Sequence, residues 1–167
     1  MSTETSLPAK RPRSVLAGPY GHPFHPILVT VPIGAWVASL VFDLISKGSD
    51  RPEVFAEGAF WLVIIGLVGA VLAAIFGLMD LLTIPSRTPA AGTALTHMAL
   101  NTIVLVLFAV SAVIRESDGR DSVSNVALGF SIAGLAVLGA SGWLGGKLSY
   151  SYGVRVADER KQADGFR

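Results

Sequence analysis

The sequence has 167 residues, of which 51% are hydrophobic and only 15% are charged. Soluble domains carry about 25% charged residues, so this composition argues against an ordinary soluble protein. The net charge of +1 gives no case for nucleic-acid binding. The lack of cysteine excludes disulfides, cysteine-ligated iron–sulfur clusters, covalently attached c-type haem and a thiol nucleophile within the chain.

The chain divides into two polar tails and a long apolar middle. Residues 1–20 are polar and rich in proline, and they predict a basic, disordered N-terminal tail. Four apolar stretches follow, each long enough to cross the hydrocarbon core. They predict transmembrane helices over residues 26–46, 58–81, 93–115 and 123–147. Residues 153–167 predict a polar C-terminal tail, so the expected fold is all-α, a four-helix transmembrane bundle over residues 21–152.

Lys and Arg are distributed unevenly between the two ends of these helices. Nine of the 13 fall in the two tails and in the connection between the second and third helices. The nine are Lys10, Arg11, Arg13, Arg87, Lys147, Arg155, Arg160, Lys161 and Arg167. Because Lys and Arg accumulate on the cytoplasmic side, this excess predicts two in-out-in hairpins with both termini in the cytoplasm. The expected location is the bacterial plasma membrane, which the chain crosses several times.

Histidines mark the predicted cytoplasmic ends of the first and third helices. His22 and His25 each precede a proline at the start of the first helix, and Pro32 predicts a kink within it. His97 and Asn101 lie four residues apart at the start of the third helix and therefore share one helix face. Helix N-termini favour neutral imidazole, the form that binds metals. We expect His25 and His97 to be the metal ligands, with His22 as the substitute for His25.

Charged residues at the same ends complete the predicted site. Asp80 ends the second helix, where a carboxylate is disfavoured, so it should have a partner. Arg87, Lys147 or a histidine N–H are the candidates, and Asp80 and Asn101 would support the ligating histidines.

The sharpest functional hypothesis is a non-covalent b-type haem, or a divalent metal, that serves electron transfer within the membrane, with quinone as one acceptor. Arg87 and Lys147 would then meet the haem propionates. The alternative is a non-enzymatic scaffold, or a subunit of a larger complex, in which the polar cluster is structural. A transporter ranks lowest, and no hydrolase or transferase site is visible. The expected partners are the lipid bilayer and either a second copy or a redox protein.

Several short motifs resemble one bacterial family. They are Gly21 to Pro26 with Asp43, Asp80 with the Ile84-Pro85 turn, His97 with Asn101, and Gly142 to Gly146 with Tyr150 and Gly153. Over residues 20–156 this set resembles the predicted membrane proteins called domain of unknown function 2231. The resemblance implies four membrane helices and no established activity. Some relatives look as if they are joined to Rieske-type iron–sulfur domains, which implies redox work.

The two predicted hairpins also resemble each other weakly. Each starts with histidine and ends in a glycine-containing turn, which suggests a parallel repeat. The sequence identity between the halves is too low to establish one.

Overall fold

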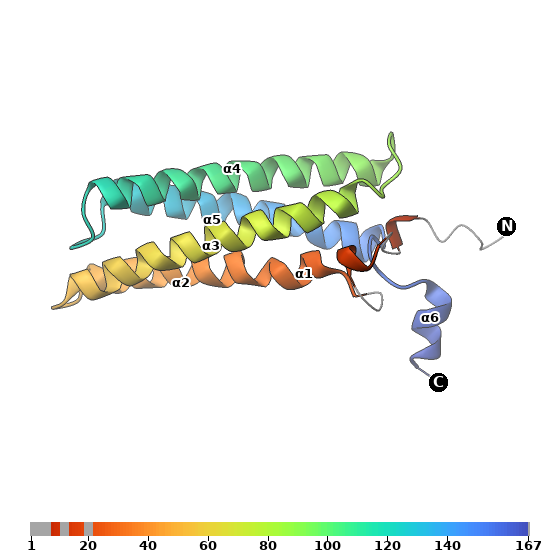
Figure 1. Cartoon of the computed structure of the whole chain (residues 1–167), viewed down its shortest axis with the longest axis horizontal. Coiled ribbons are helices and arrows are strands. Elements are labelled where there is room, and N and C mark those ends of the chain that lie inside the picture. The colour runs from red at the N-terminus through yellow and green to blue at the C-terminus, as the bar shows by residue number, and fades with distance from the viewer. Residues whose placement is uncertain (1–7, 11–13, 19–21, 167) are drawn as a thin grey trace.

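The computed structural model describes residues 8–10, 14–18 and 22–166, and the regular elements within these residues are helical. Figure 1 shows long helices lying side by side, with the start of α1 and the short helix α6 at the same end of the bundle. The first long helix is divided into α1 (Phe24–Leu28) and α2 (Thr30–Ser46). It is followed by α3 (Pro52–Leu81), α4 (Pro89–Ser117) and α5 (Asn125–Gly146). The short elements are η1 (Pro8–Lys10), η2 (Val15–Ala17), the π-helical turn η4 (Lys147–Ser151) and α6 (Glu159–Asp164).

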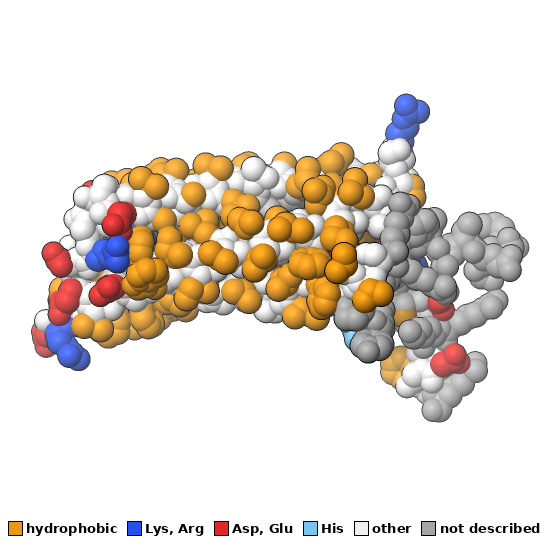
Figure 2. All heavy atoms as spheres, viewed as in Figure 1, with side chains coloured by type: hydrophobic (Ala, Val, Ile, Leu, Met, Phe, Trp, Pro, Cys, Tyr) orange, Lys and Arg blue, Asp and Glu red, His pale blue; other side chains and the backbone are white. Residues whose placement is uncertain are grey.

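Within the part of the chain that the structure describes, four segments are long and apolar enough to cross a membrane. They are Phe24–Ser46, Pro52–Leu81, Pro89–Ser117 and Asn125–Ser151. Figure 2 shows an apolar surface over the middle of the bundle, with charged side chains gathered at the end opposite the termini. The predicted all-α fold with four candidate transmembrane helices is therefore confirmed.

Helices α3 and α4 begin earlier than predicted. Each starts at a proline, Pro52 or Pro89, in the first turn, where a missing N–H costs nothing. The α4 start is also capped, because the Thr88 hydroxyl accepts a bond of 3.1 Å from the Ala91 N–H. The prediction from hydropathy missed these first turns because they are less apolar than the rest of each helix. The first turn of α3, for example, contains Glu53.

Pro32 explains why the first helix is divided. A proline within a helix has no N–H to donate, and its ring clashes with the carbonyl four residues earlier, here that of Leu28. The helix is accordingly interrupted at Val29, a turn residue between α1 and α2. The helix is thus interrupted close to where the sequence predicted a kink, and this leaves His25 in a short helix of its own that packs against α3.

The ends of the chain differ from the predicted tails. Of the expected N-terminal tail, residues 1–7, 11–13 and 19–20 lie outside the described residues. At the other end, Val154 is buried, and the Arg155 N–H donates to the Ala9 carbonyl at 2.9 Å. The packed part of the chain therefore extends past residue 152 and into residues 153–167, which were predicted to form the C-terminal tail.

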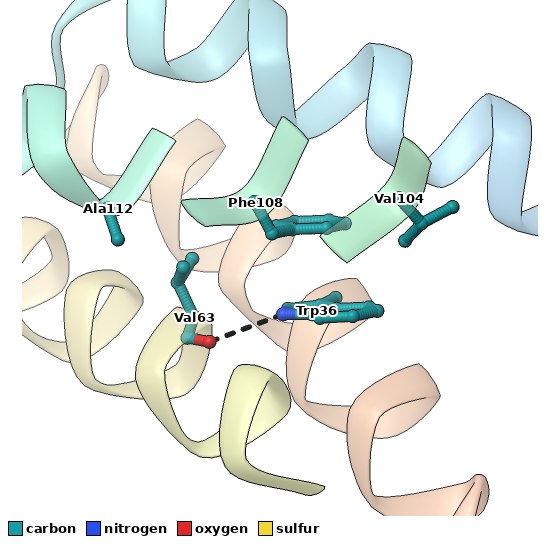
Figure 3. Packing of buried hydrophobic residues seen from close by; sticks show 5 residues of the cluster. All are labelled: Trp36, Val63, Val104, Phe108 and Ala112. Atoms are coloured by element: carbon teal, nitrogen blue, oxygen red, sulfur yellow. Dashed lines mark hydrogen bonds between the residues drawn. The ribbon is translucent and has the colours of Figure 1, made fainter. Parts of the chain in front are cut away.

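Trp36 and Phe108 form the centre of the core (Figure 3). Their rings stack with centroids 4.1 Å apart and planes 3° from parallel, and both side chains are fully buried. The indole N–H of Trp36 donates to the Val63 carbonyl at 3.3 Å. Since Trp36 belongs to α2 and Phe108 to α4, the stack joins the two hairpins.

Three contacts between the first hairpin, α1–α3, and the second, α4–α5, are those expected of an approximate twofold axis along the bundle. Three pairs of residues meet across this axis, and in each pair the two members are 72 positions apart in the sequence. The pairs are His25 with His97, Trp36 with Phe108, and Asp43 with Arg115. A residue that meets its own equivalent is what a twofold axis produces. The structure therefore supports the parallel repeat that the sequence only suggested.

Contacts within each hairpin repeat as well. In the first hairpin, Gly66 leaves room for Trp36, and in the second, Gly134 leaves room for Phe108. An added Cβ would lie 2.2 Å from the indole at Gly66 and 2.7 Å from the phenyl ring at Gly134. Glycines of the second helix of each hairpin thus let the aromatic residue of the first helix reach the axis.

Candidate functional site

His25 is held by the neighbouring helix of its own hairpin. Its Nδ1 lies 2.8 Å from the carbonyl oxygen of Ala73 in α3. A carbonyl only accepts, so this bond assigns the proton to Nδ1. The ring packs over Gly77, where an added Cβ would lie 3.0 Å from Cε1 of the imidazole. The glycine and the carbonyl together fix the orientation of the ring.

His97 repeats this arrangement in the second hairpin. Its Nδ1 lies 2.8 Å from the carbonyl oxygen of Ser141 in α5, so Nδ1 again carries the proton. An added Cβ at Gly145 would lie 3.2 Å from Cε1 of the ring. The amide nitrogen of Asn101 lies 3.1 Å from Nε2 of His97 and donates to the His97 carbonyl at 2.9 Å. Because an amide NH₂ is a donor, Nε2 must be the acceptor, and the imidazole is neutral.

The two imidazoles face each other across the axis. Their centroids are 6.4 Å apart and their planes are nearly perpendicular, at 89°. Both rings are half-buried. The expected juxtaposition of His25 and His97 is therefore present, and so is the expected pairing of Asn101 with His97.

The other predicted site residues are placed differently. His22 is exposed, and within the described part of the chain no three His, Asp or Glu residues lie close enough to hold one metal ion. Arg87 is an exposed residue of the loop between α3 and α4. Lys147 is exposed, and its Nζ lies 5.6 Å from the centre of the Tyr152 ring.

Asp80 has a partner that the sequence did not suggest. Nε of Arg155 donates to Oδ1 of Asp80 at 2.7 Å, and Nη2 lies against the same oxygen without the alignment of a hydrogen bond. The Asp80 side chain is 12% exposed and the Arg155 side chain is 5% exposed. The expected pairing with Arg87, Lys147 or a histidine is wrong for the described residues, because the chain beyond the fourth helix folds back over the end of α3.

A second polar cluster lies near the opposite end of the bundle and was missed. The Asp43 side chain is 0% exposed and that of Arg115 is 4% exposed. The two Nη atoms of Arg115 donate to the two carboxylate oxygens of Asp43 at 2.7 and 2.6 Å. Ser111 and Ser131 accept further bonds from Arg115, both at 3.2 Å. This cluster joins α2, α4 and α5 within the bundle.

The sequence carried one signal for this ion pair. Arg115 was predicted as the last residue of the third helix, and it lies in α4, which ends two residues later at Ser117. Its spacing from Asp43 equals that of His97 from His25, so a comparison of the two halves would have aligned the two charges.

Comparisons with known proteins agree with this architecture. A family model described as "Predicted membrane protein (DUF2231)" matches residues 21–158, which include all four long helices and Arg155. No curated protein and no solved structure matches the chain. Since the match extends over most of its length, the chain belongs to the DUF2231 family of predicted membrane proteins.

Proposed function

We propose that His25 and His97 would hold a non-covalent b-type haem, and that the protein transfers electrons within the membrane. The observation that carries this proposal is the shared tautomer of the two imidazoles. Both rings give their Nδ1 proton to a backbone carbonyl of the adjacent helix. Ligating histidines are commonly oriented by such a bond, which leaves the Nε2 lone pair for the metal.

The spacing of the rings suits one metal ion between them. A metal–nitrogen bond is about 2 Å long, so two imidazoles on opposite sides of a metal have centroids about 6 Å apart. The observed separation is 6.4 Å. Protein-only metal sites usually need more ligands than the pair His25 and His97 supplies. A macrocycle that brings four nitrogens of its own needs only two, and this favours haem over a divalent ion.

The protein residues would position the ligands and exclude water. Gly77 and Gly145 leave space for the imidazoles, and the carbonyls of Ala73 and Ser141 fix their rotation. When bound, haem supplies a one-electron couple at its iron. Asn101 would give up its contact with Nε2 of His97 and keep its bond to the His97 carbonyl. Arg87 and Lys147 remain predicted partners of the propionates.

A structural role is the second candidate, favoured by one specific contact. Nε2 of His97 already accepts a hydrogen bond from Asn101, so both ring nitrogens of His97 are satisfied by the protein. In that case the cluster would only fix the packing of α4 against α5 in a scaffold or a subunit of a larger complex.

A visible spectrum separates the two candidates. The protein is purified in detergent, titrated with haemin and scanned for the Soret and α/β bands of low-spin, six-coordinate haem. We expect stoichiometric binding that is lost in His25→Ala and His97→Ala but kept in the matched control His22→Ala, because His22 is exposed. Absence of these bands from the wild-type protein, or their survival in both alanine variants, would refute the haem site. Loss of thermal stability without any chromophore would favour the structural role.

A further inference from the structure

We infer that the faces of the two hairpins around Asp43 and Arg115 form a recognition surface that accepts the other hairpin and rejects a copy of itself. The partner that each face fits is the opposite hairpin of this chain. This inference does not depend on haem binding, because the ion pair lies at the other end of the bundle from the histidines.

Three levels of residue pairs follow one another along the twofold axis. At the first level the two hairpins contribute the same residue, His25 and His97, and at the second level they contribute two aromatic rings, Trp36 and Phe108. Either level would also suit a hairpin that paired with its own copy. Only the third level, Asp43 with Arg115, requires the two hairpins to differ.

Because Asp43 and Arg115 are buried, their opposite charges decide which hairpins can pair. Asp43 is 0% and Arg115 is 4% exposed, and the carboxylate and the guanidinium are joined by two parallel hydrogen bonds. Two first hairpins pairing about the same axis would bring two carboxylates together. Two second hairpins would bring two guanidinium groups together. Like charges away from water repel strongly and lack the partner that offsets their desolvation.

The residues around the ion pair can accept either charge on α4, with the opposite charge on α2. Ser111 and Ser131 lie 3.1 Å from each other through their hydroxyls, and both bond to Arg115. A hydroxyl both donates and accepts, so these serines can also solvate a carboxylate on α4. Selectivity therefore rests on the opposition of the charges across the axis rather than on which hairpin carries which sign.

Charge reversal tests this in the full-length chain. D43R places two cations on the axis and R115D places two anions. When the two variants are co-expressed with different tags, pairing of hairpins between the chains restores both ion pairs, whereas pairing within either chain restores neither. Such an exchange requires only that the connection between α3 and α4 open. We expect tandem affinity purification to recover a mixed dimer at least tenfold above the level found for two differently tagged wild-type chains.

Two further variants keep the test independent of whether each single reversal folds. The double reversal D43R/R115D should return the oligomeric state of the wild-type protein and most of the thermal stability that either single reversal loses. The matched control is E116R/R120E, because Arg120 and Glu116 also form an ion pair, at 2.6 Å, with the Glu116 side chain 60% exposed. This control should keep the oligomeric state and the thermal stability of the wild type. A D43R chain that keeps both of these, or mixed-dimer recovery no greater than that of wild type, would overturn the inference.

Discussion

Gly66 and Trp36 provide the sharpest test of how the two hairpins are joined. A Cβ added at Gly66 would lie 2.2 Å from Nε1, 2.5 Å from Cδ1 and 2.7 Å from Cε2 of the indole. Favourable contacts between such atoms occur at about 3.5–4.0 Å. Gly66→Ala must therefore displace the indole by at least about 1 Å. The displaced ring would lose its bond to the Val63 carbonyl and its stack on Phe108.

The expected cost of Gly66→Ala is the sum of three effects. Overpacking a well-packed core costs about 1–3 kcal/mol. Loss of the indole hydrogen bond costs about 1 kcal/mol. Loss of the aromatic stack costs about 1 kcal/mol more. We therefore expect the free energy of unfolding to fall by about 3–5 kcal/mol.

The assay is reversible unfolding by SDS in mixed micelles, followed by tryptophan fluorescence and circular dichroism. Gly129→Ala is the matched control, because a Cβ at Gly129 in α5 meets nothing within 4 Å. Replacing Trp36 by Leu in the Gly66→Ala background should recover part of the loss, since the smaller side chain removes the clash. Equal stability of Gly66→Ala and Gly129→Ala would refute the reasoning.

Three other predictions concern topology, the C-terminal contact and the histidine site. In intact cells a membrane-impermeant thiol reagent should label Ser122→Cys but not Ser86→Cys, which should react only after lysis; the opposite result would reverse the predicted orientation. Arg155→Met should lower the free energy of unfolding by about 3 kcal/mol, because it leaves the Asp80 carboxylate buried without its cation, whereas exposed Arg87→Met should change little; thermal unfolding measures both. Asn101→Val should tighten haemin binding about fivefold, because the amide that competes for Nε2 of His97 is worth about 1 kcal/mol. Weaker binding by this variant in a haemin titration would show that Asn101 supports the loaded site instead.

Prediction succeeded where local pattern is enough. A run of apolar residues long enough to cross a bilayer forms a helix whatever its neighbours are, because its backbone bonds must be satisfied internally. His97 and Asn101 were paired correctly because residues four apart on a helix share a face. The helix starts at Pro52 and Pro89 were missed because their first turns are less apolar than the stretches that follow them.

Prediction failed where partners come from distant parts of the chain. The candidates given for Asp80 were Arg87, Lys147 or a histidine, but its cation is Arg155, which follows the last long helix and was assigned to a tail. Nothing in local pattern distinguishes a basic residue in a tail from one that folds back over a helix end.

By itself the sequence determined the number of long helices, their approximate limits and the gathering of histidines at one end of the bundle. These follow from hydrophobicity, helix geometry and the order of segments along the chain. Only the tertiary structure decided which other residues meet across the twofold axis, because these contacts join positions 72 apart. It stacked Trp36 on Phe108, and it showed that Asp43 and Arg115, which look like ordinary residues near helix ends, are buried against each other.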